Sequence, residues 1–220
     1  MQNDSANSKK FTFYGKDLDE KATLLLAFTP PPEAGTLFQD LFPLCWKVVV
    51  SSPEDTSPTV IDFTFLTAFF VPVPLPNDLI EGLPFMPCNT GELCTLVATQ
   101  QGNIITPSIP AIPGYLACAN ATPAVAKIGL GFLDAKLPIV QPSLLWNHVP
   151  TGTQAEVRIV QYLEIYATDE FQETQIIRDP IPAFKLVWKK NLQTLGQKTS
   201  FEITVDSITG GVLVNDYQVI

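Results

Sequence analysis

The one histidine, His148, is the first residue to consider for catalysis, because a Ser-His-Asp arrangement in this chain would have to use it. It lies close to Trp146 and just before Pro150, and the Gly-x-Ser-x-Gly turn that exposes a nucleophilic serine does not occur in the sequence. A capping or core role therefore explains His148 better than proton transfer. The acidic residues fall mainly in polar stretches, where solvated surface is the default explanation, and no pair of carboxylates is singled out. We expect no enzymatic activity and no catalytic residues.

The four cysteines, Cys45, Cys88, Cys94 and Cys118, are the next candidates for chemistry. The spacing Cys88-x5-Cys94 suits a loop closed by a disulfide but fits no zinc pattern, and a second histidine is lacking. We expect buried, mostly free thiols and no metal site, and the spacing leaves open whether Cys88 and Cys94 are bridged. The segment 129–131, Gly-Leu-Gly, lacks the third glycine and the helix of a phosphate-binding loop, although its glycines allow a close approach to the backbone.

The aromatic residues remain, 14 Phe, 5 Tyr and 3 Trp in a chain with only 16% charged residues. Most such rings belong to a hydrophobic core. A sharper hypothesis is that some of them line a closed pocket for a small, flat, apolar ligand. The residues expected to bind it fall into two groups: stacking candidates Trp46, Phe63, Phe65, Trp146 and Trp188, and orienting candidates Asn147, His148 and Tyr162.

The most apolar stretch, residues 60–76, must organise the fold that positions these rings, and its residues 60–71 predict one strand. As a strand it would be apolar on both faces, which indicates a central strand between two layers, and the prolines at 72, 74 and 76 end it. The valine-rich run 45–51 is also a strand by composition. Because a polar loop of residues 51–58 joins the two, we expect strands 45–51 and 60–71 to be antiparallel neighbours.

The rest of the chain follows the same pattern of short strands and turns. Residues 156–167 alternate well and predict one long half-buried strand with Leu163 and Ile165 inward and Tyr162, Glu164 and Tyr166 outward. Residues 36–42 predict one helical turn and 169–178 a short helix. Further strands are expected at 11–14, 23–28, 93–99, 104–106, 124–132, 143–148, 184–190, 200–206 and 211–215.

This pattern predicts an all-β fold: a single-domain antiparallel β-sandwich or barrel with long Pro-rich loops, notably around residues 72–92 and 107–113. We expect residues 1–10 to form a disordered tail and residues 11–220 to form the β domain. A chain of 220 residues, 46% of them hydrophobic, is long enough to bury a sizeable core.

The net charge of −9 indicates which partners to exclude. A phosphate backbone would be repelled, and the 13 Lys and Arg are scattered, so we expect no nucleic acid. The polar N-terminus has no apolar segment behind it that would serve as a signal peptide, which indicates a cytoplasmic protein. We expect no membrane partner, and a homo-oligomer is compatible with the sequence.

An acidic chain rich in β signals, aromatics and Pro-rich arms, such as residues 69–76, Phe-Phe-Val-Pro-Val-Pro-Leu-Pro, resembles the pink chromoproteins of edible mushrooms. The resemblance is one of overall character across the chain. It implies a non-covalently held, indolone-type organic chromophore and no catalysis. The same outline also resembles fungal β-sandwich lectins, for which Trp146, Asn147 and His148 would be the sugar-binding triplet. We rank small-ligand or pigment binding first, a lectin second and a structural or storage protein third.

Overall fold

The computed structural model describes residues 8–30, 35–134, 136–158 and 162–217, and it confirms the all-β fold. The helical segments among these residues are short 3-10 turns, and none has the length and apolarity to cross a membrane. The strands are β1 (Ser8–Gly15), β2 (Ala22–Phe28), β3 (Leu41–Pro43), β4 (Lys47–Ser51), β5 (Thr59–Thr64), β6 (Thr67–Pro74), β7 (Ile80–Pro87), β8 (Glu92–Thr99), β9 (Gly102–Pro110), β10 (Leu116–Asn120), β11 (Ala126–Leu133), β12 (Val140–Val149), β13 (Gln154–Val157), β14 (Tyr162–Ala167), β15 (Leu186–Asn191), β16 (Lys198–Val205) and β17 (Val212–Tyr217).

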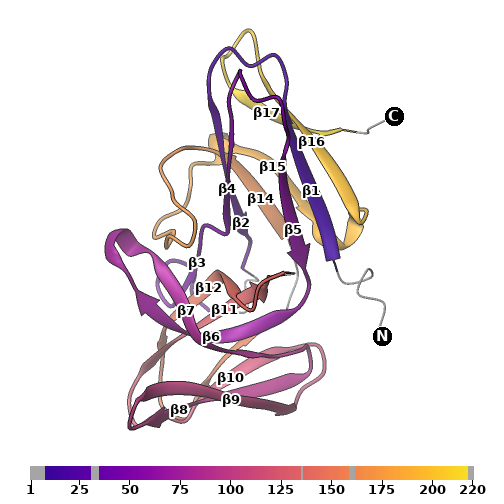
Figure 1. The fold of residues 1–220 in the computed structure, drawn as a ribbon. Coiled ribbons are helices and arrows are strands. Elements are labelled where there is room, and N and C mark those ends of the chain that lie inside the picture. Colours follow the sequence, from indigo (N-terminus) through magenta and orange to yellow (C-terminus); the bar gives the residue numbers. More distant parts are fainter. Residues whose placement is uncertain (1–7, 31–34, 135, 159–161, 218–220) are drawn as a thin grey trace.

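The strands form four sheets that pack as two sandwiches (Figure 1). The first sandwich pairs the sheet β17-β16-β1-β5 with the sheet β15-β14-β2-β4. The second, drawn below it, pairs β3-β12-β11-β6-β7 with β13-β10-β8-β9. Strand pairing is mainly antiparallel, with parallel pairing of β1 with β16 and of β8 with β10. The second sandwich is therefore built largely from the chain between β5 and β14. The expected single domain remains a prediction.

Each sandwich has its own core. In the first sandwich the inward residues of facing strands meet, as the period-two alternation of a strand requires. Its largest fully buried members are Phe11, Phe13, Leu24, Leu26, Trp46, Phe63 and Phe201. The second core is formed around Phe69, Leu96, Leu116, Ile128, Leu144 and three of the four cysteines.

The apolar run 60–71 is two strands, because the chain passes from one sandwich to the other between Thr64 and Thr67. Phe63 of β5 lies in the first core, whereas Phe69 of β6 lies in the second core and Phe70 packs in a third cluster on the opposite face of its sheet. The prediction that apolar residues on both faces mark a strand between two layers is confirmed for β6.

The predicted pairing of strands 45–51 and 60–71 is wrong. Strand β4 pairs with β2, and β5 pairs with β1. These two pairs belong to the two facing sheets of the first sandwich, so the loop of residues 52–58 crosses between sheets. A loop of this length reaches across a sandwich about 10 Å thick as easily as it closes a hairpin.

The long strand predicted over residues 156–167 is also two strands. Strand β13 contributes Val157 to the second core and β14 contributes Leu163 and Ile165 to the first. The predicted alternation of β14 is confirmed, since these two side chains point inward while Glu164 and Tyr166 lie on the other face. The prediction for residues 159–161 lies outside the described residues.

No helix forms over residues 169–178, where we expected one. This segment makes a turn and two isolated β-bridges, Leu44 with Ile176 and Leu79 with Gln175. Ile176 and Ile177 pack into different clusters, as neighbours do in an extended chain and not in a helix. Residues 36–42 likewise form a hydrogen-bonded turn leading into β3.

Several segments predicted as loops or tail are strands. The Pro-rich segments 72–92 and 107–113 contain the end of β6, all of β7 and the end of β9, and β7 and β9 are edge strands of their sheets. Edge positions tolerate proline because the missing N–H is not needed by a second neighbour. Strand β1 begins at Ser8, three residues before the expected start. Residues 1–7 of the expected tail lie outside the described residues.

Gly129 on β11 packs against the ring of Phe70 on the neighbouring strand β6. A Cβ at position 129 would lie 2.1 Å from Cζ of Phe70. The close approach expected of this glycine is therefore made by an aromatic ring of the protein itself.

We predict that Gly129→Ala destabilises the protein by about 2 kcal/mol or more, because the Phe70 ring must leave its place in the packed cluster. Urea unfolding followed by tryptophan fluorescence measures the effect. The matched control is Gly196→Ala, where the nearest atom to an added Cβ is a backbone oxygen at 3.4 Å. Equal stability of the two variants would contradict this account of Gly129.

The four cysteines are free and buried. Burial is the main cause that raises the pKa of the thiols of Cys45 and Cys118 to about 12 each, since it disfavours the charged thiolate. We predict that the native protein reacts slowly with a thiol reagent at pH 8 and that four thiols react after denaturation without reductant. Two reactive thiols in the denatured protein would instead reveal a bridge between Cys88 and Cys94.

Candidate functional site

An aromatic cluster fills the part of the first core that faces the second sandwich. Trp46, which directly precedes β4, meets Phe63 edge to face with ring centres 5.6 Å apart, and Phe63 meets Phe65 at 4.9 Å. Phe28 of β2 lies 5.1 Å from Trp46, and Phe132 from the second sandwich lies 4.6 Å from Phe28. Three of the predicted stacking residues, Trp46, Phe63 and Phe65, are thus in one place, where Trp46 and Phe65 both pack edge to face with Phe63.

The other two tryptophans lie elsewhere, so the three do not line one common space. Trp188 is in the first core but packs edge to face on Phe201 at 5.1 Å, with its indole N–H donated to Asp216. Trp146 is in the second core, 6.3 Å from Phe69. The ligand-binding role predicted for these residues remains a prediction.

The orienting candidates are also separated. Asn147 is half-buried and its backbone N–H is donated to the carbonyl of Asp40 at 2.8 Å. His148 is exposed on the same strand, β12. Tyr162 is on β14 of the first sandwich. Its ring is exposed, and Nζ of Lys189 lies over it, 5.7 Å from the ring centre. Asn147 and His148 are close to each other in the chain, and Tyr162 belongs to a different sandwich.

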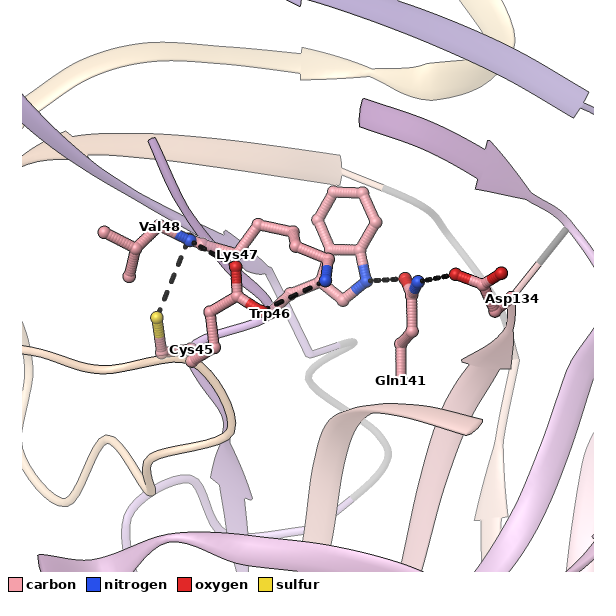
Figure 2. Close-up of polar contacts among 7 residues, drawn as sticks. Cys45, Trp46, Lys47, Val48, Asp134 and Gln141 are labelled. Carbon is pink, nitrogen blue, oxygen red and sulfur yellow. Dashed lines mark hydrogen bonds and ion pairs between the residues drawn. The ribbon is translucent and has the colours of Figure 1, made fainter. Parts of the chain in front are cut away.

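A polar chain leads from the aromatic cluster to the surface (Figure 2). The indole N–H of Trp46 is donated to Oε1 of Gln141 at 2.9 Å, and the amide of Gln141 is donated to Asp134 at 2.6 Å. Burial raises the pKa of Asp134, but backbone N–H groups and the Gln141 amide outweigh it, so the pKa lies below its usual value. Since Trp46 and Gln141 come from different sandwiches, this chain ties the two together.

A polar cleft of about 310 Å³ lies beside this chain, lined by residues of both sandwiches. Four of its charged side chains form ion pairs: Lys47 pairs with Glu173 at 3.1 Å, and Lys136 pairs with Asp62 at 2.5 Å. The fifth, Asp134, accepts hydrogen bonds from the backbone N–H groups of Lys136 and Leu137 and from the Gln141 amide.

A second cavity, of about 220 Å³, lies on the outer face of the sheet β15-β14-β2-β4, and we call it the Phe38 cavity. The turn after residue 36 and the segment 177–181 line its outer side. Phe28, a member of the aromatic cluster, forms part of its wall. Its lining residues are Ala27, Phe28, Pro30, Leu37, Phe38, Pro43, Glu164, Tyr166, Ile177, Pro180 and Ile181.

The polar wall of the Phe38 cavity consists of Glu164 and Tyr166, two residues apart on β14. The phenol of Tyr166 donates to Oε2 of Glu164 at 2.7 Å, and Lys189 donates to Oε1 at 2.6 Å. Burial raises the pKa of Glu164, but the hydrogen bonds from Lys189 and Tyr166 more than offset it, and the pKa is lowered. Burial and the Glu164 carboxylate raise the pKa of Tyr166. The wall therefore holds a carboxylate and a neutral phenol at pH 7.

Sequence reasoning missed this cavity, although it placed Glu164 and Tyr166 correctly on the face opposite the core. The available signal was an acidic residue between two tyrosines on the same face of a strand. That face is covered by Ile177, from the segment that follows β14, and by Phe38, from a distant part of the chain.

Comparison with protein-family models, with curated proteins and with solved structures finds no match to this chain. The candidate site therefore rests on its own geometry: a largely apolar cavity with one half-buried carboxylate and phenol pair, the combination typical of small-molecule sites.

We predict that Glu164→Gln lowers stability by about 1–2 kcal/mol near neutral pH, because charge-assisted hydrogen bonds become neutral ones. A lowered folded-state pKa means that the carboxylate stabilises the fold above its unfolded pKa of about 4.3 and ceases to do so as the pH falls through the folded value. Urea unfolding of both proteins from pH 7 to pH 3 should show their difference shrinking in acid. A difference that is constant with pH would contradict the ionised state of Glu164.

Proposed function

We propose that this protein is a non-catalytic binding protein that holds a small, flat, mainly apolar molecule in the Phe38 cavity. The observation that carries the proposal is the lining of that cavity, in which aromatic and aliphatic side chains surround the pair Glu164 and Tyr166. Apolar walls supply affinity, and a few fixed polar atoms supply orientation.

The size of the cavity, about 220 Å³, limits the ligand to one or two fused rings. Such a molecule buries about 200 Å² of apolar surface, which contributes about 5 kcal/mol at about 25 cal/mol per Å². One hydrogen bond of about 1 kcal/mol brings the total to a dissociation constant on the order of tens of micromolar.

A conjugated ligand would make the protein a chromoprotein, and the resemblance to mushroom pink chromoproteins supports this form of the proposal. Its test is the visible absorption spectrum of protein purified from its natural source, followed by mass spectrometry of a solvent extract. Colour that leaves the protein with the extract is the expected result. A colourless protein whose extract contains no aromatic compound would exclude a resident pigment.

The location of the binding site is tested by filling the cavity. We predict that Leu37→Trp weakens the binding of indole, measured by titration calorimetry, at least about tenfold, because the larger ring occupies the ligand's space. Leu37 lines the cavity and is 41% exposed, so the substitution need not disturb the core. The matched control is Ile208→Trp, at an exposed turn position. Equal indole binding by both variants, or no binding by the unaltered protein, would contradict the proposal.

The lectin alternative has less support, because the residues expected to bind sugar, Trp146, Asn147 and His148, do not form an exposed aromatic site. A sugar-stacking ring must be exposed, whereas Trp146 is only 5% exposed. Asn147 and His148 then offer polar groups without the aromatic platform. Binding to a glycan array with elution by free sugar would favour the lectin over the apolar ligand.

A further inference from the structure

The polar atoms that line the Phe38 cavity are mainly hydrogen-bond acceptors. The phenol of Tyr166 carries a single hydrogen, which it donates to Glu164, so its oxygen retains only acceptor capacity. Oε2 of Glu164 accepts from Tyr166 and Oε1 accepts from Lys189, and an ionised carboxylate has no hydrogen to donate.

The backbone of the lining adds to this imbalance. Pro30, Pro43 and Pro180 have no N–H group at all. The N–H of Phe38 is donated to the carbonyl of Leu41 at 2.8 Å, and that of Ile177 to the carbonyl of Pro43 at 3.0 Å. These five lining residues therefore present no free N–H to a ligand.

A side chain of the protein neutralises the negative charge of this wall. Lys189 lies 2.6 Å from Glu164 and neutralises the one carboxylate in the lining. A cationic ligand would lose its hydration without meeting an unpaired anion, whereas a neutral donor needs only an acceptor oxygen.

We propose that the Phe38 cavity selects neutral aromatic molecules that carry one N–H or O–H donor, which they give to the oxygen of Tyr166 or to Glu164. This inference rests on the proposed function, because it names the class of ligand that the same cavity takes. An aromatic molecule of similar shape that has only acceptor atoms would place its lone pairs against those of Tyr166 and Glu164, with no hydrogen between them.

Three bicyclic compounds of nearly equal size test the selection by titration calorimetry on the full chain: indole, which donates an N–H, indene, which has no polar atom, and benzofuran, which has only an acceptor oxygen. We expect indole to bind about fivefold tighter than indene, and benzofuran to bind no better than indene. Equal affinities for all three would overturn the donor requirement while leaving apolar binding intact. Absence of binding by all three would overturn the proposed function itself, so the two failures are distinguishable.

Two further measurements identify the atoms and the charge. Tyr166→Phe keeps the ring but removes its oxygen, and it should reduce the preference for indole over indene, whereas Tyr162→Phe, on the same strand but outside the cavity, should leave that preference unchanged. An unchanged preference in Tyr166→Phe would overturn the role of this oxygen. If that variant does not fold, the ranking of the three compounds by the unaltered protein still decides the donor requirement. Tryptamine, which adds an ammonium group to indole, should bind more weakly, and tighter binding would overturn selection for neutral ligands.

Discussion

The insertion of Phe132 into the core of the first sandwich is the contact that fixes the relation between the two halves of the molecule. Phe132 belongs to β11 of the second sandwich, yet its ring centre lies 4.6 Å from Phe28 and 4.8 Å from Phe63. The hydroxyl of Thr64 donates to the carbonyl of Leu133 at 2.6 Å directly beside it. Because aromatic contacts of this kind are short-ranged and closely packed, the sandwiches have little freedom to tilt at this point. The hydrogen bond between Trp46 and Gln141 depends on the same fit.

The outer faces of the sheets are covered by two segments that run past both sandwiches. Leu44, directly after β3, forms a β-bridge with Ile176 in the segment after β14, and Arg178 binds Asp78 of the second sandwich through two hydrogen bonds of 2.8 and 2.6 Å. This ion pair is exposed and contributes little to stability by itself. The ion pair instead fixes the position of the segment after β14. Ile177, Pro180 and Ile181 of that segment line the Phe38 cavity.

The sequence predicts what depends on local alternation. The all-β class, the two-sided covering of β6 and the faces of Leu163 and Glu164 all follow from period-two patterns. Strand partners do not follow, because alternation shows which face is buried and not which sheet buries it. The runs 60–71 and 156–167 therefore read as single strands, although each crosses between sandwiches. The Phe38 cavity was beyond sequence reasoning for a related reason: Phe38 and Tyr166 lie far apart in the chain, and their meeting is a property of the whole fold.

The position of β1 beside β16 has a consequence for synthesis on the ribosome. Strand β1, the first in the described part of the chain, pairs with β16, so the sheet β17-β16-β1-β5 lacks half of its strands until residues 198–217 have emerged. All strands of the second sandwich have been made by residue 157. Domains generally fold as units as they emerge, so the nascent chain holds β1 and β5 exposed while the second sandwich assembles. Phe63 and Phe132 would then form a template on which the last strands dock.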